Sequence, residues 1–366
     1  MRPFTRLPLC LALFTFILSG CIQNRCSLPE FEGVCQDKPS DMTMSDQNSS
    51  DGCTPSNTNE QTFKFNDITE AHSIHAISMI DGTDKPVIAF NLINEKKKTF
   101  YIIAYNKSDP CSSRRRFGQY KIPSQELHTQ GISASADGFS FAANFIDNSQ
   151  HFQYNIGLDL TIANPTSKTN QAWSMNSGSN GTLHVLVESD ATGKQLLSAS
   201  DNRNFSTVNY APSVPSELAD ISRIVTGKLT SDQDGMLAWS KNGNYVYFSE
   251  LSPDSILINA SAAYPTIEGC STLLQQVCPV AMEDITGDHA GELIVATPQS
   301  IIIHIRKLSE IKDIKTTQID TKVQAQAISV SKNFNKKSRK IIWASSKFEN
   351  NANTVTINTI PVSSIM

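Results

Sequence analysis

The sequence lacks the local motifs by which many catalytic sites are recognised. It contains no G-x-S-x-G nucleophile elbow, no H-E-x-x-H zinc motif, no P-loop and no G-x-G-x-x-G turn. No C-x₂-C pair occurs either, so the cysteines do not have the spacing of a typical zinc site. No local motif therefore assigns this chain to one of these enzyme classes.

The sequence also lacks an excess of basic residues. It has 31 Lys and Arg against 35 Asp and Glu, which gives a formal charge of −4. Removal of residues 1–20 takes away Arg2 and Arg6, so −4 minus 2 leaves −6. A mildly acidic protein has no general electrostatic attraction to nucleic acid, and we expect no nucleic-acid partner.

Only one apolar run is long, and it lies at the N-terminus. Leu9 to Leu18 reads "LCLALFTFIL" and follows Arg2 and Arg6. A membrane-spanning helix needs about 20 apolar residues, so this shorter run predicts a cleavable export signal over residues 1–20. The next residues, "LSGC" from Leu18 to Cys21, resemble the lipobox of bacterial lipoproteins. The alternative is an ordinary signal peptide with a chance cysteine.

The lipoprotein resemblance implies an anchor at Cys21. The cysteine would carry thioether-linked diacylglycerol and an amide-linked acyl chain such as palmitate, and more than one acyl chain makes membrane attachment stable. Ile22 follows the cysteine in place of the Asp that marks inner-membrane retention in enteric bacteria. The resemblance therefore implies a lipid-anchored protein of the bacterial cell envelope, at the outer membrane.

Six cysteines remain after Cys10 in the signal and Cys21 at the lipid site. An even number in an exported chain predicts disulfide bonds, although six cysteines allow 15 connectivities. Proximity favours Cys270–Cys278 first and Cys26–Cys35 second. That choice leaves Cys53–Cys111 to join the N-terminal segment to the body.

The composition divides the mature chain into a tether and a body. Residues 21–61 include the segment from Gln36 to about Gln61, which is rich in Ser, Asn, Asp and Thr and poor in aliphatic residues. Such a segment cannot bury enough apolar surface to order itself unaided, so it predicts a flexible tether. Residues 62–366 form the body.

The body predicts an all-β fold. Short runs such as "TFYIIAY", "LHVLVE" and "ELIVAT" alternate with Gly, Asn, Asp and Ser turns.

A polar turn that leads directly into an apolar strand recurs six times. The strand entries lie near Val87, Phe139, Leu183, Leu237, Leu293 and Ile341. A period near 50 residues is typical of propeller blades. We therefore predict a six- or seven-bladed β-propeller, in which "TFKFNDI" (Thr62 to Ile68) or the C-terminal "TVTINTIPV" completes a shared closing blade. The alternative is a β-sandwich.

One of these turns, "DITGDHAGELIVA" from Asp284 to Ala296, resembles the FG-GAP/VCBS repeats. In that family an Asp-rich turn precedes a blade strand and often binds Ca²⁺. The resemblance implies Asp284, Asp288 and Glu292 as ligands of a weak calcium site. Thr286 and His289 depart from the family pattern, and Asp and Gly also suit any tight turn, so a purely structural turn is the favoured interpretation and the weak calcium site is the alternative.

Two further features of the sequence bear on function. Ser198 to Phe205 resembles the Asp-box turn of sialidase-like propellers, but Ser200 and Asn202 replace its Asp and Gly. The basic run Arg114, Arg115 and Arg116 is a candidate anion-binding patch, because Arg pairs with planar anions; a solvated loop is the alternative.

We expect a non-enzymatic binding or scaffold module for a protein or glycan partner in the envelope. No certain cofactor and no catalytic residue is predicted. The competing hypothesis is an envelope polysaccharide hydrolase or lyase with an active site at the centre of the propeller. Converging carboxylates or a metal cluster in the axial cavity would favour the enzyme.

Overall fold

The computed structural model describes part of the chain. The described ranges are 43–44, 52–54, 59–81, 84–122, 131–144, 151–163, 165–168, 171–177, 184–190, 193–199, 206–207, 209–211, 221–228, 234–240, 246–251, 255–262, 278–285, 291–296, 300–307, 312–320, 324–333 and 339–365. The predicted signal peptide, Cys21, Cys26, Cys35 and Cys270 lie outside these ranges.

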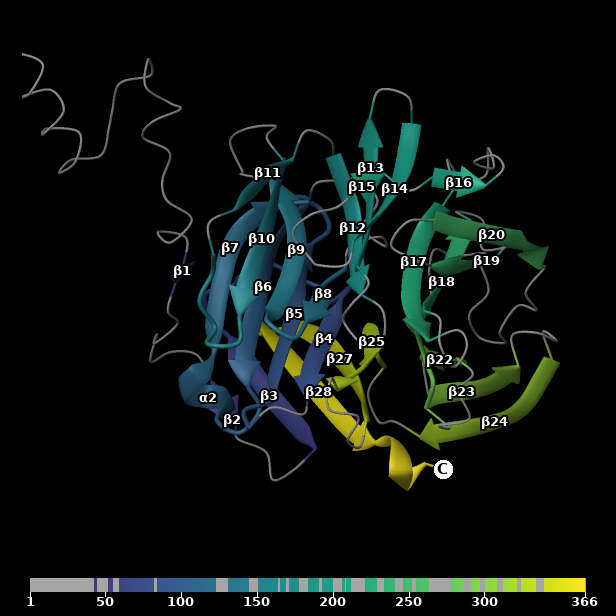
Figure 1. Cartoon of the computed structure of the whole chain (residues 1–366). Coiled ribbons are helices and arrows are strands. Elements are labelled where there is room, and N and C mark those ends of the chain that lie inside the picture. The colour runs from purple at the N-terminus through teal and green to yellow at the C-terminus, as the bar shows by residue number, and fades with distance from the viewer. Residues whose placement is uncertain are drawn as a thin grey trace, which may run out of the picture.

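The described strands form units of consecutive antiparallel strands (Figure 1). Unit 1 consists of β4 (Ile77–Asp81), β5 (Val87–Asn94), β6 (Thr99–Asn106) and β7 (Arg115–Lys121). Unit 2 consists of β8 (Ser133–Ser135), β9 (Gly138–Asn144), β10 (His151–Gly157) and β11 (Thr166–Lys168). The two units form one sheet, in which only the pair of Lys121 with Asn144 joins β7 to β9.

Three more units follow along the chain. Unit 3 consists of β12 (Gln171–Ser177), β13 (His184–Asp190), β14 (Gly193–Ala199) and β15 (Ser206–Thr207). Unit 4 consists of β17 (Ile221–Lys228), β18 (Asp234–Ser240), β19 (Val246–Leu251) and β20 (Ser255–Ala262), and β16 (Asn209–Ala211) runs parallel to β20. Unit 5 consists of β21 (Val280–Glu283), β22 (Glu292–Ala296), β23 (Ser300–Lys307) and β24 (Lys312–Asp320).

Unit 6 combines both ends of the body. It begins with β25 (Ala327–Val330), β27 (Lys340–Glu349) and β28 (Ala352–Pro361). The outer edge of β28 then pairs with β3 (Glu60–Phe65). Both segments predicted to complete the closing blade are therefore present in it. A short parallel strand, β26 (Lys332–Asn333), also pairs with β4 of unit 1, and the chain ends in the 3₁₀ turn η6 (Val362–Ser364).

The first strands of the units contact one another in sequence. β4 contacts β8, β8 contacts β12, and β12 contacts β17. In the same way β17 contacts β21, β21 contacts β25, and β25 contacts β4. The prediction of an all-β body is confirmed for the described residues, and the arrangement is propeller-like.

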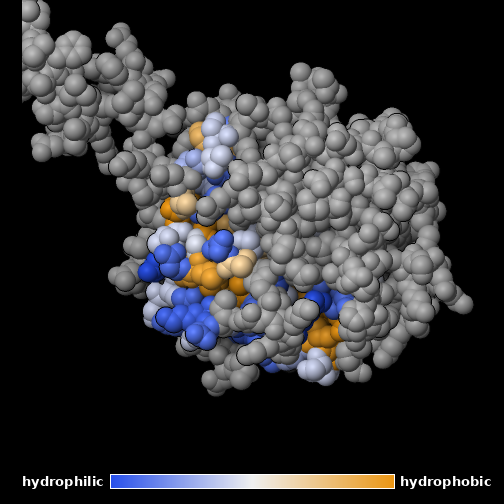
Figure 2. Space-filling view, in the orientation of Figure 1, coloured by the Kyte–Doolittle hydropathy of each residue, from blue (hydrophilic) through white to orange (hydrophobic). Residues whose placement is uncertain are grey.

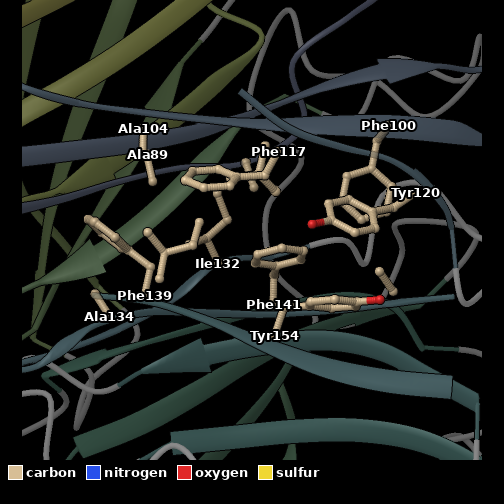
Figure 3. Close-up of a cluster of buried hydrophobic side chains, with 14 of the residues drawn as sticks. Ala89, Phe100, Ala104, Phe117, Tyr120, Ile132, Ala134, Phe139, Phe141 and Tyr154 are labelled. Atoms are coloured by element: carbon tan, nitrogen blue, oxygen red, sulfur yellow. The ribbon is translucent and has the colours of Figure 1, made fainter. Parts of the chain in front are cut away.

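The core lies between consecutive units, because strands such as β5 are buried on both faces. Alternate side chains of β5 enter two different clusters: Val87 and Ala89 pack toward unit 2, whereas Ile88 and Phe90 pack toward unit 6. This explains the continuous apolar run of the strand. The cluster between units 1 and 2 is aromatic (Figure 3), and its rings include the stacked pair Phe141 and Tyr154, whose centroids are 5.4 Å apart.

Two short stretches of the predicted tether pair with strands of the body. β1 (Thr43–Met44) pairs with β7, and β2 (Cys53–Thr54) pairs with β3. A polar segment can adopt strand structure here because body strands satisfy its backbone hydrogen-bonding groups. These two short stretches are therefore ordered by the body, and the extent of the tether stays a prediction. Among the described residues, no helix has the length and apolar character needed to cross a bilayer.

Candidate functional site

The contact between unit 6 and unit 1, which we call the closing seam, contains an ion pair. Asp81 ends β4, and its Oδ2 lies 2.8 Å from Nζ of Lys340 at the start of β27. The side chains are 10% and 24% exposed respectively. Asp81 lies on the same face of β4 as Ile77 and Met79, which pack in the apolar cluster of this seam. The strand alternation therefore directs the carboxylate into the contact between the two units.

A second charged group lies on the opposite flank of unit 6. Glu283 ends β21, its side chain is 1% exposed, and its Oε1 accepts a hydrogen bond of 2.7 Å from Nη1 of Arg339. Nζ of Lys332 lies 3.6 Å from Oε2 of the same carboxylate. Arg339 also donates to the backbone carbonyl of Asp284 at 2.5 Å. A buried carboxylate needs such partners, because desolvation without pairing is costly.

Both carboxylates occupy the same position in their units, at the end of the first strand. Each is paired with cations of unit 6, so in this structure they link adjacent units. Glycoside hydrolysis uses two carboxyl groups on either side of the scissile bond. Here each of the two carboxylates contacts a cation of unit 6. The described residues contain no group of three or more His, Cys, Asp or Glu side chains suited to a metal ion.

The predicted calcium loop is described at its two ends, and Asp288 lies outside the described residues. Glu292 is fully buried, and its Oε2 accepts a 2.6 Å hydrogen bond from the backbone N–H of Ile285. At the other end, the Arg339 guanidinium donates a hydrogen bond to the backbone carbonyl of Asp284. At these two described ends, a cation contacts a backbone carbonyl and a carboxylate accepts a backbone hydrogen bond. The calcium site itself, which would need six to eight oxygen ligands, stays a prediction.

The arginine run lies at the start of a strand and not in a solvated loop. Arg114 and Arg116 are both buried. The guanidinium of Arg114 lies over the rings of Phe63 and Phe65, at 5.6 Å and 5.2 Å from their centroids. These contacts are cation–π interactions, which account for the burial of the charge.

Arg116 binds a carboxylate of its own chain. Its Nη1 donates to Asp67 Oδ1 at 2.9 Å, and its Nη2 lies 2.6 Å from Oδ2, so the pair is bidentate. Burial raises the pKa of Asp67, but the Arg116 hydrogen bond and charge outweigh it, so the net shift is downward. Arg115 donates to the backbone carbonyls of Ser112 and Arg114. For Arg116, the planar anion is therefore the carboxylate of Asp67 in the same chain.

The disulfide between Cys53 and Cys111 is confirmed. Cys53 lies on β2 at the outer edge of unit 6, and Cys111 lies in the short helix α2 (Pro110–Ser113) after β6 of unit 1. The bond therefore crosses the closing seam. Cys278 is also disulfide-bonded, and the pairing with Cys270 stays a prediction because Cys270 lies outside the described residues.

Sequence reasoning missed Glu283, Lys332, Arg339 and Lys340, whose partners are distant along the chain. An alignment of the repeats could have shown that Asp81 and Glu283 each end a first strand just before the turn.

Figure 2 shows the described part of one face, where apolar residues are bordered by hydrophilic ones. On the described part of this face, side-chain character alone does not single out an exposed site.

No protein-family model matches the chain. No curated protein sequence matches it either. Among solved structures, a mutant α-L-arabinofuranosidase from Fusarium graminearum in complex with an iminosugar inhibitor superimposes with a TM-score of 0.51, at 13% identity over 80% of this chain and 94% of that one.

Two further structures are less similar. A complex of the GH93 α-L-arabinofuranosidase of the same fungus with arabinobiose has a TM-score of 0.47, at 12% identity over 80% of this chain and 94% of that one. A gluconolactonase from Xanthomonas campestris has a TM-score of 0.43, at 6% identity over 82% of this chain and 90% of that one. At these identities the likeness concerns the fold alone, and the first structure supports a propeller-like β fold for this chain.

Proposed function

We propose that this chain is a lipid-anchored protein of the bacterial cell envelope whose body is a six-bladed β-propeller that binds a protein or glycan partner. The blade number is supported by the succession of contacts from β4 through β8, β12, β17, β21 and β25 back to β4. Closure is supported by the pairing of β3 with β28, which places both ends of the body in one blade. A ring closed in this way is a rigid support for variable loops.

The observation that carries the binding hypothesis is the pairing of the first-strand carboxylates. Asp81 is held by Lys340, and Glu283 is held by Arg339 and Lys332. These acids therefore stabilise the contacts between blades, and they are not arranged as a catalytic acid and base. A rigid, internally paired body suits presentation of a surface to a partner.

The anchoring part of the proposal is tested by Cys21→Ser. We expect this variant to appear in the soluble fraction of cells, whereas the wild type sediments with membranes. Mass spectrometry of the N-terminal peptide should show acyl chains on the wild type only. Acylation that persists in Cys21→Ser would refute the anchor.

The binding part is tested by crosslinking in intact cells, followed by purification of the protein under denaturing conditions. We expect one envelope protein, or one glycan on an array of envelope polysaccharides, to be enriched over a matched lipoprotein control. Equal recovery with the control would contradict the proposal.

An envelope polysaccharide hydrolase or lyase is the second candidate. It is favoured by the likeness in fold to an α-L-arabinofuranosidase. The test is release of reducing ends or of unsaturated products from arabinan and other polysaccharides by the purified body, residues 62–366 preceded by the segment that contains Cys53. We expect no release above the buffer control, and a turnover signal would reverse the order of the two candidates.

A further inference from the structure

A small cavity lies at the closing seam, beside the charged pair. Its volume is about 130 Å³. The elements that contribute to it, β3, β5, β28 and the turn between β6 and α2, meet in the part of the molecule marked by α2, β3 and β28 in Figure 1. The cavity is lined by Asn59, Glu60, Gln61, Ile88, Tyr105, Lys107, Ser108, Pro110, Ile357 and Thr359. Its size accommodates a small organic group and not a polymer.

Lys107 is the only cation among the described residues of this lining. Its Nζ donates a 2.8 Å hydrogen bond to Thr359 Oγ1. Among the residues that the structure describes, no carboxylate forms an ion pair with it. The nearby Asp81 is already paired with Lys340. Burial lowers the pKa of Lys107 and the charge of Lys340 lowers it further, whereas Asp81 opposes the shift.

Backbone hydrogen bonds hold both residues of this lysine–threonine contact in place. The backbone N–H of Lys107 donates to Pro86 O at 2.7 Å, and the backbone N–H of Thr359 donates to Asn59 O at 2.7 Å. Thr359 therefore holds the lysine head from the unit 6 side, while the stem comes from unit 1. A charge held in this way is prepared for an anion, because little side-chain entropy remains to be lost on binding.

The rest of the lining selects the kind of anion. Ile88, Tyr105 and Ile357 are buried and form an apolar wall. A phosphate carries more than one negative charge and prefers several donors, which one lysine does not provide. A carboxylate with a short organic body matches a single positive charge beside apolar surface. Glu60 is exposed and also lines the cavity, and its negative charge repels a multiply charged anion more strongly than a single carboxylate.

We infer that this cavity binds the carboxylate end of a small organic acid, with Lys107 as the anion partner. A free acid and the uronate end of a glycan share this chemistry. The inference goes beyond the proposed function, because it assigns a small-molecule subsite whether or not the body also binds a protein partner.

The test is calorimetric titration of the full mature chain with glucuronate, butyrate, a uronate-terminated oligosaccharide and inorganic phosphate. We expect the organic acids to bind more tightly than phosphate. Butyrate binding as tight as that of the uronates would identify a free apolar acid as the ligand, whereas tighter binding of the oligosaccharide would identify a glycan end. Phosphate binding equal to the acids, or no binding of any organic acid, would overturn the inference.

Variants separate the site from general charge effects. Lys107→Met should weaken binding of the acids at least about tenfold, because a charge-assisted hydrogen bond is lost. Lys64→Met, which changes an exposed lysine of β3 that does not line the cavity, is the matched control and should leave binding unchanged. Glu60→Gln should bind as tightly as the wild type or more tightly. Equal weakening by Lys107→Met and Lys64→Met would contradict the site.

A second measurement remains informative if Lys107→Met does not fold. Reductive methylation with a ¹³C-labelled reagent keeps the lysine charge and gives each lysine an NMR signal. The signal of Lys107, assigned from Lys107→Arg, should move on addition of glucuronate, whereas that of Lys64 should not. A Lys107 signal that stays in place at saturating acid would refute the inference.

Discussion

Lys340 and Asp81 form an ion pair of 2.8 Å between the last unit of the body and the first strand of the first unit. The same stretch of unit 6 carries Arg339, which pairs with Glu283 of unit 5. Unit 6 is therefore held by charge on both flanks. Because it also contains β3 from the N-terminal side, these pairs stabilise the place where the two ends of the body meet.

Asp81→Asn should lower the free energy of unfolding by about 1–3 kcal/mol. The substitution leaves the mostly buried ammonium of Lys340 without its counter-charge, and Lys107 nearby adds a second positive charge. Urea unfolding followed by tryptophan fluorescence measures the change. Lys347→Gln is the matched control, since its pair with Glu349 is exposed and its loss should cost less than about 0.5 kcal/mol. A double-mutant cycle of Asp81→Asn with Lys340→Met that gives no coupling energy would contradict this account.

Removal of the seam disulfide should destabilise the body more than any single ion pair. Cys53 and Cys111 are 58 positions apart, and their Cα atoms are 5.6 Å apart. Opening a loop of that length costs up to about 4 kcal/mol in the chain-entropy model. The double variant Cys53→Ala, Cys111→Ala should therefore shift the urea midpoint downward. An unchanged midpoint, with the disulfide of the wild type verified by mass spectrometry, would show that the seam does not depend on this bond.

The strands were predictable because their signals are local. The polar turns of the repeat lead into β5, β9, β22 and β27, each of which begins within a residue of the predicted entry. These are the second strands of their units. A turn with Gly, Asp or Asn beside an apolar run can be recognised without any knowledge of the rest of the chain.

The candidate site was not predictable in the same way, because its contacts join distant segments. Nothing near Asp81 indicates that Lys340 will face it. The basic run is the clearest case: Arg114 looks like an exposed charge in the sequence, yet it is buried against Phe63 and Phe65 from β3. Tertiary packing decided between an anion-binding patch and an internal cation–π contact.

Stability should fall as the pH drops below about 6.5, in part because of His72. Burial lowers the pKa of His72 below its ordinary value of 6.5, against the opposing effects of the carbonyl and charge of Glu70. The unfolded chain therefore binds the proton more readily, so this contribution is complete above pH 6.5 and is lost as the pH falls through the folded-state pKa. His72→Gln should flatten the dependence of the unfolding free energy on pH below 6.5. Equal slopes for His72→Gln and the wild type would assign that dependence to other groups.

Chelation should have little effect on the body. Glu292 already accepts a hydrogen bond from Ile285, and Arg339 occupies the carbonyl of Asp284, so the turn is closed by groups of the chain. We expect EDTA to lower the melting temperature by less than about 2 °C, which corresponds to under roughly 1 kcal/mol for a domain of this size. Glu292→Gln should destabilise equally with and without calcium. A larger fall of the melting temperature in EDTA, reversed by added Ca²⁺ in the wild type but not in Glu292→Gln, would instead support a calcium site in this loop.

Gly227→Ala should destabilise the contact between unit 4 and unit 5. Gly227 lies on β17, and a Cβ atom built there would be 1.8 Å from the carbonyl oxygen of Met282 on β21. The obstacle is backbone, so a first strand would have to move, at a cost of about 1–3 kcal/mol. Gly52→Ala is the control, because its Cβ would be 3.3 Å from the Cβ of Lys64, and that variant should melt close to the wild type. Equal melting temperatures for Gly227→Ala and Gly52→Ala would show that β17 and β21 are not packed as closely as the structure has them.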